Sequence, residues 1–339
     1  MKFKLFLLFT FLIIPVAKAI EFKSNDRIVL LGNTFIERDV NFGHIETFLS
    51  IALADKKVTF RNLGWSGDTV HCHARSYFGP PKEGFDRLSK HIDFIKPTMV
   101  IICYGSVAAF EGEKGIEGFQ EGYKKMIDMI RSRAGSRIAL ISPPPCENLG
   151  SPLPNMNYQN VRLSKYNKVI KEIALREECE YIDLFSALGG GKTRMIPPVT
   201  LNGVHFTSQG YRKVASVMME VMGFEDKVDV SSSEREKLRQ IILKKNRLFF
   251  NRWRPQNETY LHGFRKHEQG NNAKEIPMFD PLIKEKETKT KKESNNITIN
   301  YPDAEELEFG IDEESLRAYF PINKVLDGLF FVISKIFSI

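Results

Sequence analysis

The sequence has few of the features that mark the specialised protein classes. Its 339 residues include only 4 cysteines, too few for a scaffold built on disulfides, so a packed core must hold the fold. Hydrophobic residues make up 42% and charged residues 27%, which excludes wholesale disorder, a collagen-like chain and a multi-pass membrane protein. The length allows one large domain with extensions or two modest domains.

Residues 1–19 have the pattern of a secretory signal peptide. Lys2 and Lys4 precede an apolar run over 5–16, and Ala-Lys-Ala at 17–19 matches a cleavage site. The apolar run is shorter than the ~20 residues of a membrane-spanning helix, which disfavours the alternative of an uncleaved anchor. We therefore expect a secreted or periplasmic protein.

The excess of positive charge is small once the signal is removed. The full chain carries +7, and the signal contains three lysines and no acids, so 46 bases face 42 acids afterwards, or +4. This balance and the export pattern make nucleic acid an unlikely partner.

Short apolar runs alternate with amphipathic stretches from residue 27 to about 222. This alternation is typical of βαβ units and predicts a three-layer α/β/α domain with a five-stranded, mostly parallel sheet in residues 20–228. The expected strands cover 27–31, 58–63, 99–104, 137–141 and 181–184, and the expected helices cover 44–53, 116–131, 161–177 and 208–222. Ligands of such sheets bind at the carboxyl ends of the strands, so the loops there should carry the chemistry.

The composition changes after residue 228. Residues 229–283 form a basic extension, with an amphipathic helix expected over 234–254 and an irregular aromatic-rich stretch after it. The bases and aromatics of 234–270 suit a protein or glycan partner, but packing against the domain is the favoured interpretation.

The last region, 284–339, is predicted to hold a polar linker to residue 296, an acidic segment and a C-terminal amphipathic helix. Charges interrupt the apolar stripe of 322–339, so this helix is not expected to span a membrane. It either docks on the protein or contacts a membrane peripherally.

Four glycine-containing loops stand at the predicted strand ends or before the last helix. A glycine at such a turn is uninformative alone, because backbone geometry often requires it. In order, the four loops are Gly32-Asn33-Thr34, Ser66-Gly67-Asp68, Gly105-Ser106-Val107 and Asn202-Gly203-Val204-His205. Together they resemble the blocks of the SGNH (GDSL-type) ester hydrolases over residues 25–222. In that family the blocks hold Gly-Asp-Ser, a second glycine, Gly-x-Asn and Asp-x-x-His.

The resemblance implies a flavodoxin-like fold, no cofactor, no metal ion and a Ser-His-Asp mechanism. Gly67 and His205 match the family pattern, whereas Thr34, Val107 and Asn202 stand at the serine, asparagine and aspartate positions. The implied roles are nucleophile for Thr34, base for His205 and orienting residue for Asn202, with the backbone amides of Thr34 and Gly67 as the oxyanion hole.

The three departures have different consequences. Thr34 keeps a hydroxyl, and Asn202 has a side-chain oxygen that could accept a hydrogen bond from the imidazole, as in Cys-His-Asn sites. Val107 donates no hydrogen bond, and the loss of one oxyanion donor typically costs about 10²–10³ in rate. The expected function is a secreted ester hydrolase with carbohydrate esters as candidate substrates. The alternative is an inactive binding module for a glycan or protein.

Three other patterns are interpreted as structural. The tripeptide 71–73, His-Cys-His, lacks a third ligand for a metal. The run 189–193 imitates a phosphate loop, but Ser186 stands where that motif needs glycine. Glu37 and Asp68 are carboxylates near the predicted site that could assist it, but they are interpreted as solvated surface acids. A disulfide between Cys72 and Cys146 is one candidate pairing, because both should lie near the carboxyl edge of the sheet.

Overall fold

The computed structural model describes residues 20–77, 79–192, 196–224 and 231–297. All of these belong to one compact unit of the chain. The predicted signal peptide (1–19), the acidic segment and the C-terminal helix (322–339) lie outside the described residues.

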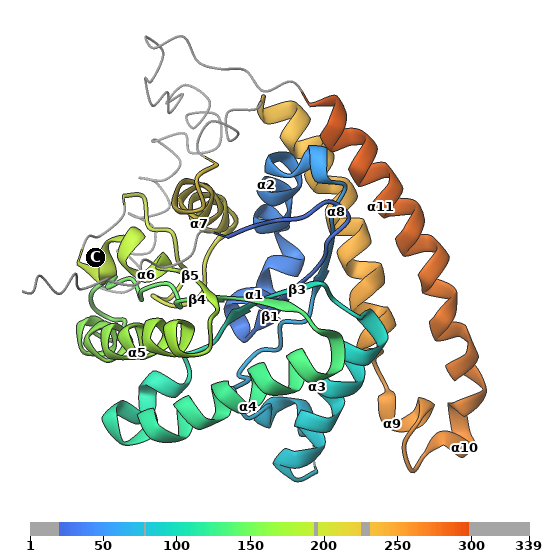
Figure 1. The fold of residues 1–339 in the computed structure, drawn as a ribbon, viewed down its shortest axis with the longest axis horizontal. Coiled ribbons are helices and arrows are strands. Elements are labelled where there is room, and N and C mark those ends of the chain that lie inside the picture. Colours follow the sequence, from blue (N-terminus) through green and yellow to red (C-terminus); the bar gives the residue numbers. More distant parts are fainter. Residues whose placement is uncertain (1–19, 78, 193–195, 225–230, 298–339) are drawn as a thin grey trace, which may run out of the picture. The chain divides into compact units, whose positions relative to one another are not determined.

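A five-stranded sheet of order β2-β1-β3-β4-β5 forms the centre of the domain, and all four strand pairings are parallel (Figure 1). The strands are β1 (Arg27–Gly32), β2 (Thr59–Asn62), β3 (Met99–Cys103), β4 (Arg137–Ile141) and β5 (Glu180–Ile182). They agree with the predicted ranges to within one or two residues. The α/β prediction is therefore confirmed.

Helices cover both faces of the sheet, which gives the three layers. Alternate residues of β1 divide between two cores, with Ile28 and Leu30 in one and Val29 and Leu31 in the other. Helices α2 and α7 pack in the first core, and α3, α4 and α5 in the second. The helices of the domain are α1 (Thr34–Arg38), α2 (His44–Ala52), α3 (Pro81–Ile95), α4 (Ile116–Ala134), α5 (Asn157–Arg176), α6 (Leu184–Ala187) and α7 (Ser208–Val221).

Short 3-10 helices connect these elements at Asp39–Asn41, Ala54–Lys56, His73–Ser76, Ala108–Gly115 and Gly189–Gly191. Helix α3 is absent from the predicted elements. Its signals in the sequence are Pro81 in the first turn and the spacing of Leu88 and Ile92, which are four residues apart and buried.

The predicted basic helix is α8 (Ser232–Trp253), and it packs on the domain through α2 and β2. Phe249 and Trp253 are buried in the larger core. Lys245 is 1% exposed, forms an ion pair with the buried Glu46 of α2 and donates to the carbonyl of Phe60 at 3.2 Å. An unpaired charge at this depth would be strongly destabilising, so the pair fixes how α8 lies on the domain.

The chain then passes through α9 (Glu258–Leu261), α10 (Lys266–Gln269) and a 3-10 helix (Gly270–Met278) to α11 (Phe279–Asn296). The sequence prediction of a linker over 284–296 is wrong, because these residues form most of α11. Lys237 and Arg252 of α8 pair with Glu293 and Asp280 of α11, so the two helices run antiparallel, side by side (Figure 1). Only Ile283, Thr290 and Ser294 of α11 are buried, and this narrow, mostly polar stripe explains why hydrophobic periodicity misses the helix.

None of the helices in the described ranges is both long and apolar enough to cross a membrane. All four cysteines are free and buried, so the suggested Cys72–Cys146 bridge is not formed. Burial raises the pKa of the Cys72 thiol to about 12 and that of Cys146 to about 11, so both remain protonated.

Candidate active site

Thr34 is the first residue of α1, directly after β1. Gly32 permits this tight strand-to-helix turn, because a Cβ there would lie 2.6 Å from both the Cys103 carbonyl oxygen and the Ile36 side chain. Asn33 caps the helix, and its amide also donates to Ser106 Oγ at 2.7 Å. The Thr34 hydroxyl is thus presented at the carboxyl end of the central strands.

The loop after β2 brings Gly67 against Thr34. The Gly67 N–H donates to Thr34 Oγ1 at 3.1 Å. Beside it, the Ser66 N–H donates to Glu37, and Glu37 also pairs with Arg254 at 2.8 Å. Glu37 is therefore not the solvated acid that the sequence suggested. It ties the second loop to α1 and to the end of α8.

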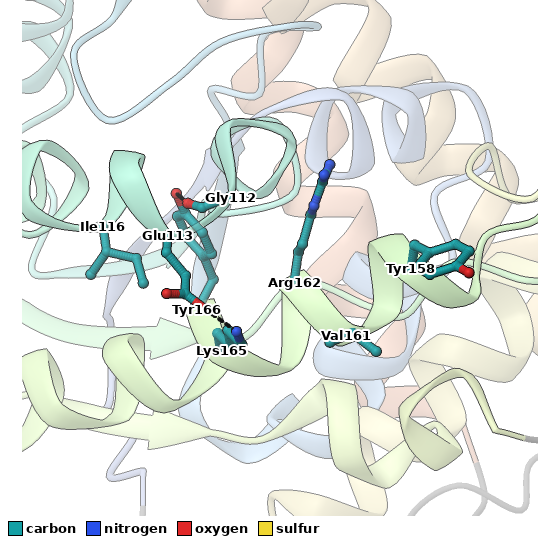
Figure 2. Close-up of a pocket in the computed structure, with 8 residues that line it drawn as sticks. All are labelled: Gly112, Glu113, Ile116, Tyr158, Val161, Arg162, Lys165 and Tyr166. Atoms are coloured by element: carbon teal, nitrogen blue, oxygen red, sulfur yellow. Dashed lines mark hydrogen bonds and ion pairs between the residues drawn. The ribbon is translucent and has the colours of Figure 1, made fainter.

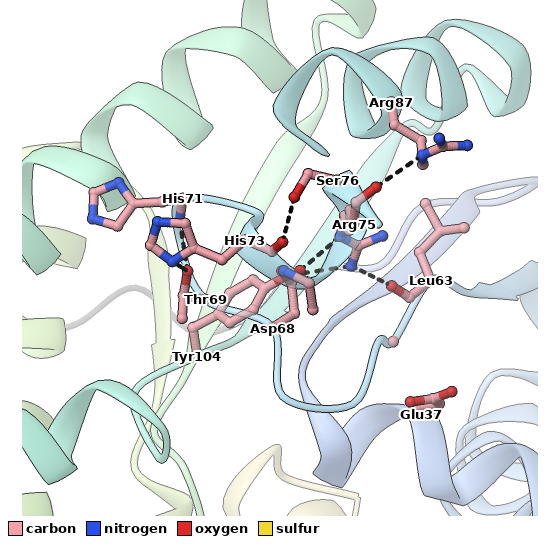
Figure 3. Close-up of polar contacts among 12 residues, drawn as sticks. Glu37, Leu63, Asp68, Thr69, His71, His73, Arg75, Ser76, Arg87 and Tyr104 are labelled. Atoms are coloured by element: carbon pink, nitrogen blue, oxygen red, sulfur yellow. Dashed lines mark hydrogen bonds and ion pairs between the residues drawn. The ribbon is translucent and has the colours of Figure 1, made fainter. Parts of the chain in front are cut away.

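A buried network holds Asp68, the residue that follows Gly67 in this loop (Figure 3). Asp68 and Arg75 are both fully buried and form an ion pair with Nε to Oδ2 at 2.6 Å. The Tyr104 hydroxyl donates to the same carboxylate oxygen at 2.7 Å, and Arg75 also donates to the Leu63 carbonyl. Burial raises the pKa of Tyr104, which keeps this phenol a donor. The interpretation of Asp68 as a surface acid is wrong, since it holds the loop that carries Gly67.

The His205 turn is held by Glu147, which the sequence analysis did not identify. One carboxylate oxygen of Glu147 accepts from the Thr200 N–H at 2.9 Å and from its hydroxyl at 2.7 Å. Gly203 has a φ of +86°, and a Cβ there would lie 2.6 Å from the Glu147 carbonyl oxygen. These contacts fix the turn in which Asn202 and His205 face each other.

Asn202 contacts His205 with its nitrogen rather than its oxygen. Its Oδ1 accepts from the N–H groups of Val204 at 3.2 Å and His205 at 2.9 Å, while its Nδ2 lies 3.2 Å from His205 Nδ1. Turning the amide over would set its NH₂ against two N–H donors. The amide therefore donates to Nδ1, which places the ring proton on Nε2. The expectation that the Asn202 oxygen accepts from the imidazole is wrong, because that oxygen is used by its own turn.

Partial burial, and then the nearby Arg38, lower the pKa of His205 below its usual value. The imidazole is consequently neutral at pH 7, as a general base must be. The orientation set by Asn202 opposes this role, because the nitrogen that should accept the nucleophile's proton already carries one.

Thr34 and His205 line one small cavity of about 90 Å³. Val107 also lines it and supplies an apolar wall at the family's asparagine position. Hydrogen bonds join Gly67 to Thr34 and Asn202 to His205, and Thr34 and His205 both line this space. Its volume is far below the ~300 Å³ at which drug-sized ligand pockets begin.

A second cavity of about 450 Å³ lies between α5 and the segment before α4 (Figure 2). Tyr158 and Val161 line it and are largely exposed, and Lys165 pairs with Glu113. Arg162 of this cavity donates to the carbonyl of Phe110, a residue that lines the first cavity. No histidine lines this second cavity, so it lacks a hydroxyl-imidazole pair.

The histidines of the His-Cys-His tripeptide lie together without a further ligand. His71 and His73 have ring centroids 5.3 Å apart, and His73 Nδ1 is 2.9 Å from the Thr69 hydroxyl (Figure 3). Within the described parts of the chain, no group of three or more His, Cys, Asp or Glu side chains could hold a metal ion.

Comparison with known proteins identifies the family. The model of the GDSL-like lipase/acylhydrolase family matches residues 41–213. The chain belongs to this family. The matched range includes Gly67, Asn202 and His205 and begins after Thr34. No curated protein sequence matches the chain.

Solved structures similar to the chain include three hydrolytic or drug-metabolising enzymes. A catalytic mutant of the acetylxylan esterase Axe2 from Geobacillus stearothermophilus is 14% identical, with 61% of this chain and 98% of that chain covered and a TM-score of 0.47. An alpha/beta hydrolase from the metagenome of Lake Arreo is 15% identical, with 60% and 98% covered and a TM-score of 0.45. A gut microbial diltiazem-metabolizing enzyme is 17% identical, with 60% and 48% covered and a TM-score of 0.44.

Proposed function

We propose that the protein is a slow hydrolase of small acyl esters, with acetylated carbohydrates as the substrate class. The observation that carries the proposal is the hydrogen bond from the Gly67 N–H to Thr34 Oγ1, at a cavity that His205 also lines. The Thr34 hydroxyl and the neutral His205 imidazole line one space, and the amide donor of Gly67 contacts that hydroxyl. Membership of the GDSL-like lipase/acylhydrolase family supports ester hydrolysis as the reaction.

The reaction follows from these positions. Thr34 Oγ1 attacks the ester carbonyl, and the amides of Gly67 and Thr34 stabilise the oxyanion. His205 takes the hydroxyl proton and returns it to the leaving alcohol. Water, activated by the same imidazole, then releases the acid from the acyl-threonine. The size of the cavity favours a short acyl group over a long chain.

Two features make turnover slow. His205 must first shift its proton from Nε2 to Nδ1, against the Asn202 amide, and an Asp-to-Asn change of this kind lowers kcat by about 10⁴ in a serine protease. The apolar Val107 removes one oxyanion donor, worth about 10²–10³. These losses concern the chemical step rather than binding.

A second candidate is a binding module without turnover for the same class of ligand. The specific observation in its favour is the donation from Asn202 to His205 Nδ1, which withholds the base. The rate of acetate release from an aryl acetate, measured for the wild type, Thr34→Ala and His205→Ala, separates the two candidates. A rate lost in both variants supports the hydrolase. A wild-type rate equal to that of both variants, with ligand still bound, supports the binding module.

We also propose that the protein is exported, on the strength of the signal pattern in residues 1–19. The test is the N-terminal sequence of the protein recovered from its native host. A mature N-terminus at residue 20 in an extracytoplasmic fraction is expected, and an intact N-terminus in the cytoplasm would contradict the proposal.

A further inference from the structure

The small cavity contains one charged side chain among its lining residues. Arg38 lines it together with Thr34 and His205, and the other lining residues are apolar or uncharged. No carboxylate lines this space, so its positive charge is not balanced locally.

The Arg38 side chain has no hydrogen-bond or ion-pair partner among the described residues, and its Nε is buried without a partner. The two adjacent acids are engaged elsewhere. Glu37 pairs with Arg254 and accepts the Ser66 N–H. Asp39 is buried and accepts the His44 N–H at 3.0 Å, at the start of α2. A guanidinium left free beside two committed carboxylates is available to an external anion.

Arg38 also has a defined position relative to the reaction centre. It follows Thr34 by four residues on α1, so the two side chains lie on the same face of that helix. Its positive charge lies close enough to His205 to lower the pKa of the imidazole. An anion held by Arg38 would therefore sit beside the scissile ester rather than at a remote surface.

We propose that Arg38 binds a carboxylate of the substrate, so that the cleft prefers esters that carry a carboxylate near the reacting carbonyl. The proposal rests on the proposed function, because it takes ester hydrolysis at Thr34 as the reaction. The preference for a carboxylate comes from Arg38. A planar, always charged guanidinium suits a carboxylate through paired N–H donors. The carboxylate can belong to the acyl part, as in a dicarboxylic monoester, or to the alcohol part, as in an acetylated acidic sugar.

The test compares three probes in the wild type and in Arg38→Gln. Phenyl acetate is neutral, phenyl hydrogen succinate carries the carboxylate on the acyl side, and 4-acetoxybenzoate carries it on the alcohol side. The ratio of wild-type to variant kcat/KM is taken for each probe, so the intrinsic reactivity of the probe cancels. Arg162→Gln removes a charge that does not line the small cavity but contacts the carbonyl of Phe110, which does, and it serves as the matched control.

The expected result is a ratio for one carboxylate probe that exceeds the ratio for phenyl acetate by about 10- to 100-fold, as for a charge-assisted hydrogen bond. The probe that responds shows which part of the substrate holds the carboxylate. Arg162→Gln should give similar ratios for all three. Equal ratios for the three probes in Arg38→Gln would overturn the proposal, because Arg38 would then act without regard to the substrate's charge.

A binding measurement separates failure of this inference from failure of the proposed function. If neither protein turns over any probe, the hydrolase proposal fails, and titration calorimetry with 4-acetoxybenzoate and phenyl hydrogen succinate decides the role of Arg38. Binding of either probe at least tenfold weaker in Arg38→Gln than in Arg162→Gln supports it. Equal binding of both probes by the two variants overturns it.

Discussion

Replacement of Asn202 by aspartate should raise the rate of ester hydrolysis. In the wild type, Asn202 Oδ1 accepts two backbone N–H groups and Nδ2 faces His205 Nδ1. A carboxylate in the same position would keep the backbone bonds and place its second oxygen at Nδ1. The ring proton would then move to Nδ1 and leave Nε2 free to accept from Thr34.

The magnitude follows from the reverse change in a serine protease, where loss of the aspartate lowers kcat by about 10⁴. We expect Asn202→Asp to raise kcat for an aryl acetate by up to about 10⁴, which corresponds to about 5 kcal/mol in the barrier. The new carboxylate should also raise the pKa of His205, because a nearby negative charge favours the imidazolium. The acid limb of the rate profile should therefore move to higher pH.

The assay is the initial rate of aryl acetate hydrolysis across pH, with ¹⁵N NMR of the histidine ring to identify the protonated nitrogen. Asn202→Ala is the control that removes the side chain without adding a charge. The double variant Asn202→Asp, His205→Ala tests whether the gain in rate depends on the imidazole. An unchanged rate in Asn202→Asp, with the ring proton moved to Nδ1, would refute the reasoning. A gain that survives His205→Ala would refute it as well.

Three further predictions concern charges around the site and the extension. Removing the positive charge in Arg38→Gln should raise the pKa of His205 and move the acid limb of kcat/KM for a neutral ester to higher pH; an unmoved limb would show that the two groups are not coupled. Lys245→Met should lower the free energy of unfolding in urea by about 3–5 kcal/mol, because Glu46 is left buried and unpaired, and Glu46→Gln in the same protein should recover part of the loss. Burial raises the pKa of Asp39 to about 7 from 3.8, so protonation favours the folded state, and this contribution to stability is lost as pH rises from about 4 to 7. The free energy of unfolding of Asp39→Asn, relative to that of the wild type, should therefore rise by up to about 4 kcal/mol between pH 4 and pH 8. A difference in this free energy that does not change with pH would contradict the prediction.

The sheet could be predicted from the sequence because its strands are short, apolar and separated by turn residues. Strands β1 and β3 are buried on both faces, and their runs of Ile, Val and Leu predict this burial. Helix α11 could not be found in the same way. It rests on α8 through ion pairs and a narrow stripe, so its sequence has the composition of a linker.

For the candidate site, the sequence predicted the location but not the contacts of each residue. The location was predicted from the four loops, since parallel strands bring their carboxyl ends to one edge. The burial and hydrogen-bond partners of the individual residues could not be predicted. Asp68 is buried because Arg75 and Tyr104 meet it in the fold. Asn202 shows its nitrogen to His205 because its oxygen closes a local turn. Arg38 is free because Glu37 and Asp39 have other partners. Each of these depends on contacts that only the folded chain creates.

Whether Thr34 is the nucleophile can be tested by mixing the protein with 4-nitrophenyl acetate, quenching in acid and mapping its peptides by mass spectrometry. We expect an acetyl group on Thr34 in the wild type, more of it at early times in Asn202→Asp, and none in His205→Ala. An unmodified Thr34 in all three proteins, or an acetyl group confined to surface lysines, would contradict the assignment of Thr34 as the nucleophile.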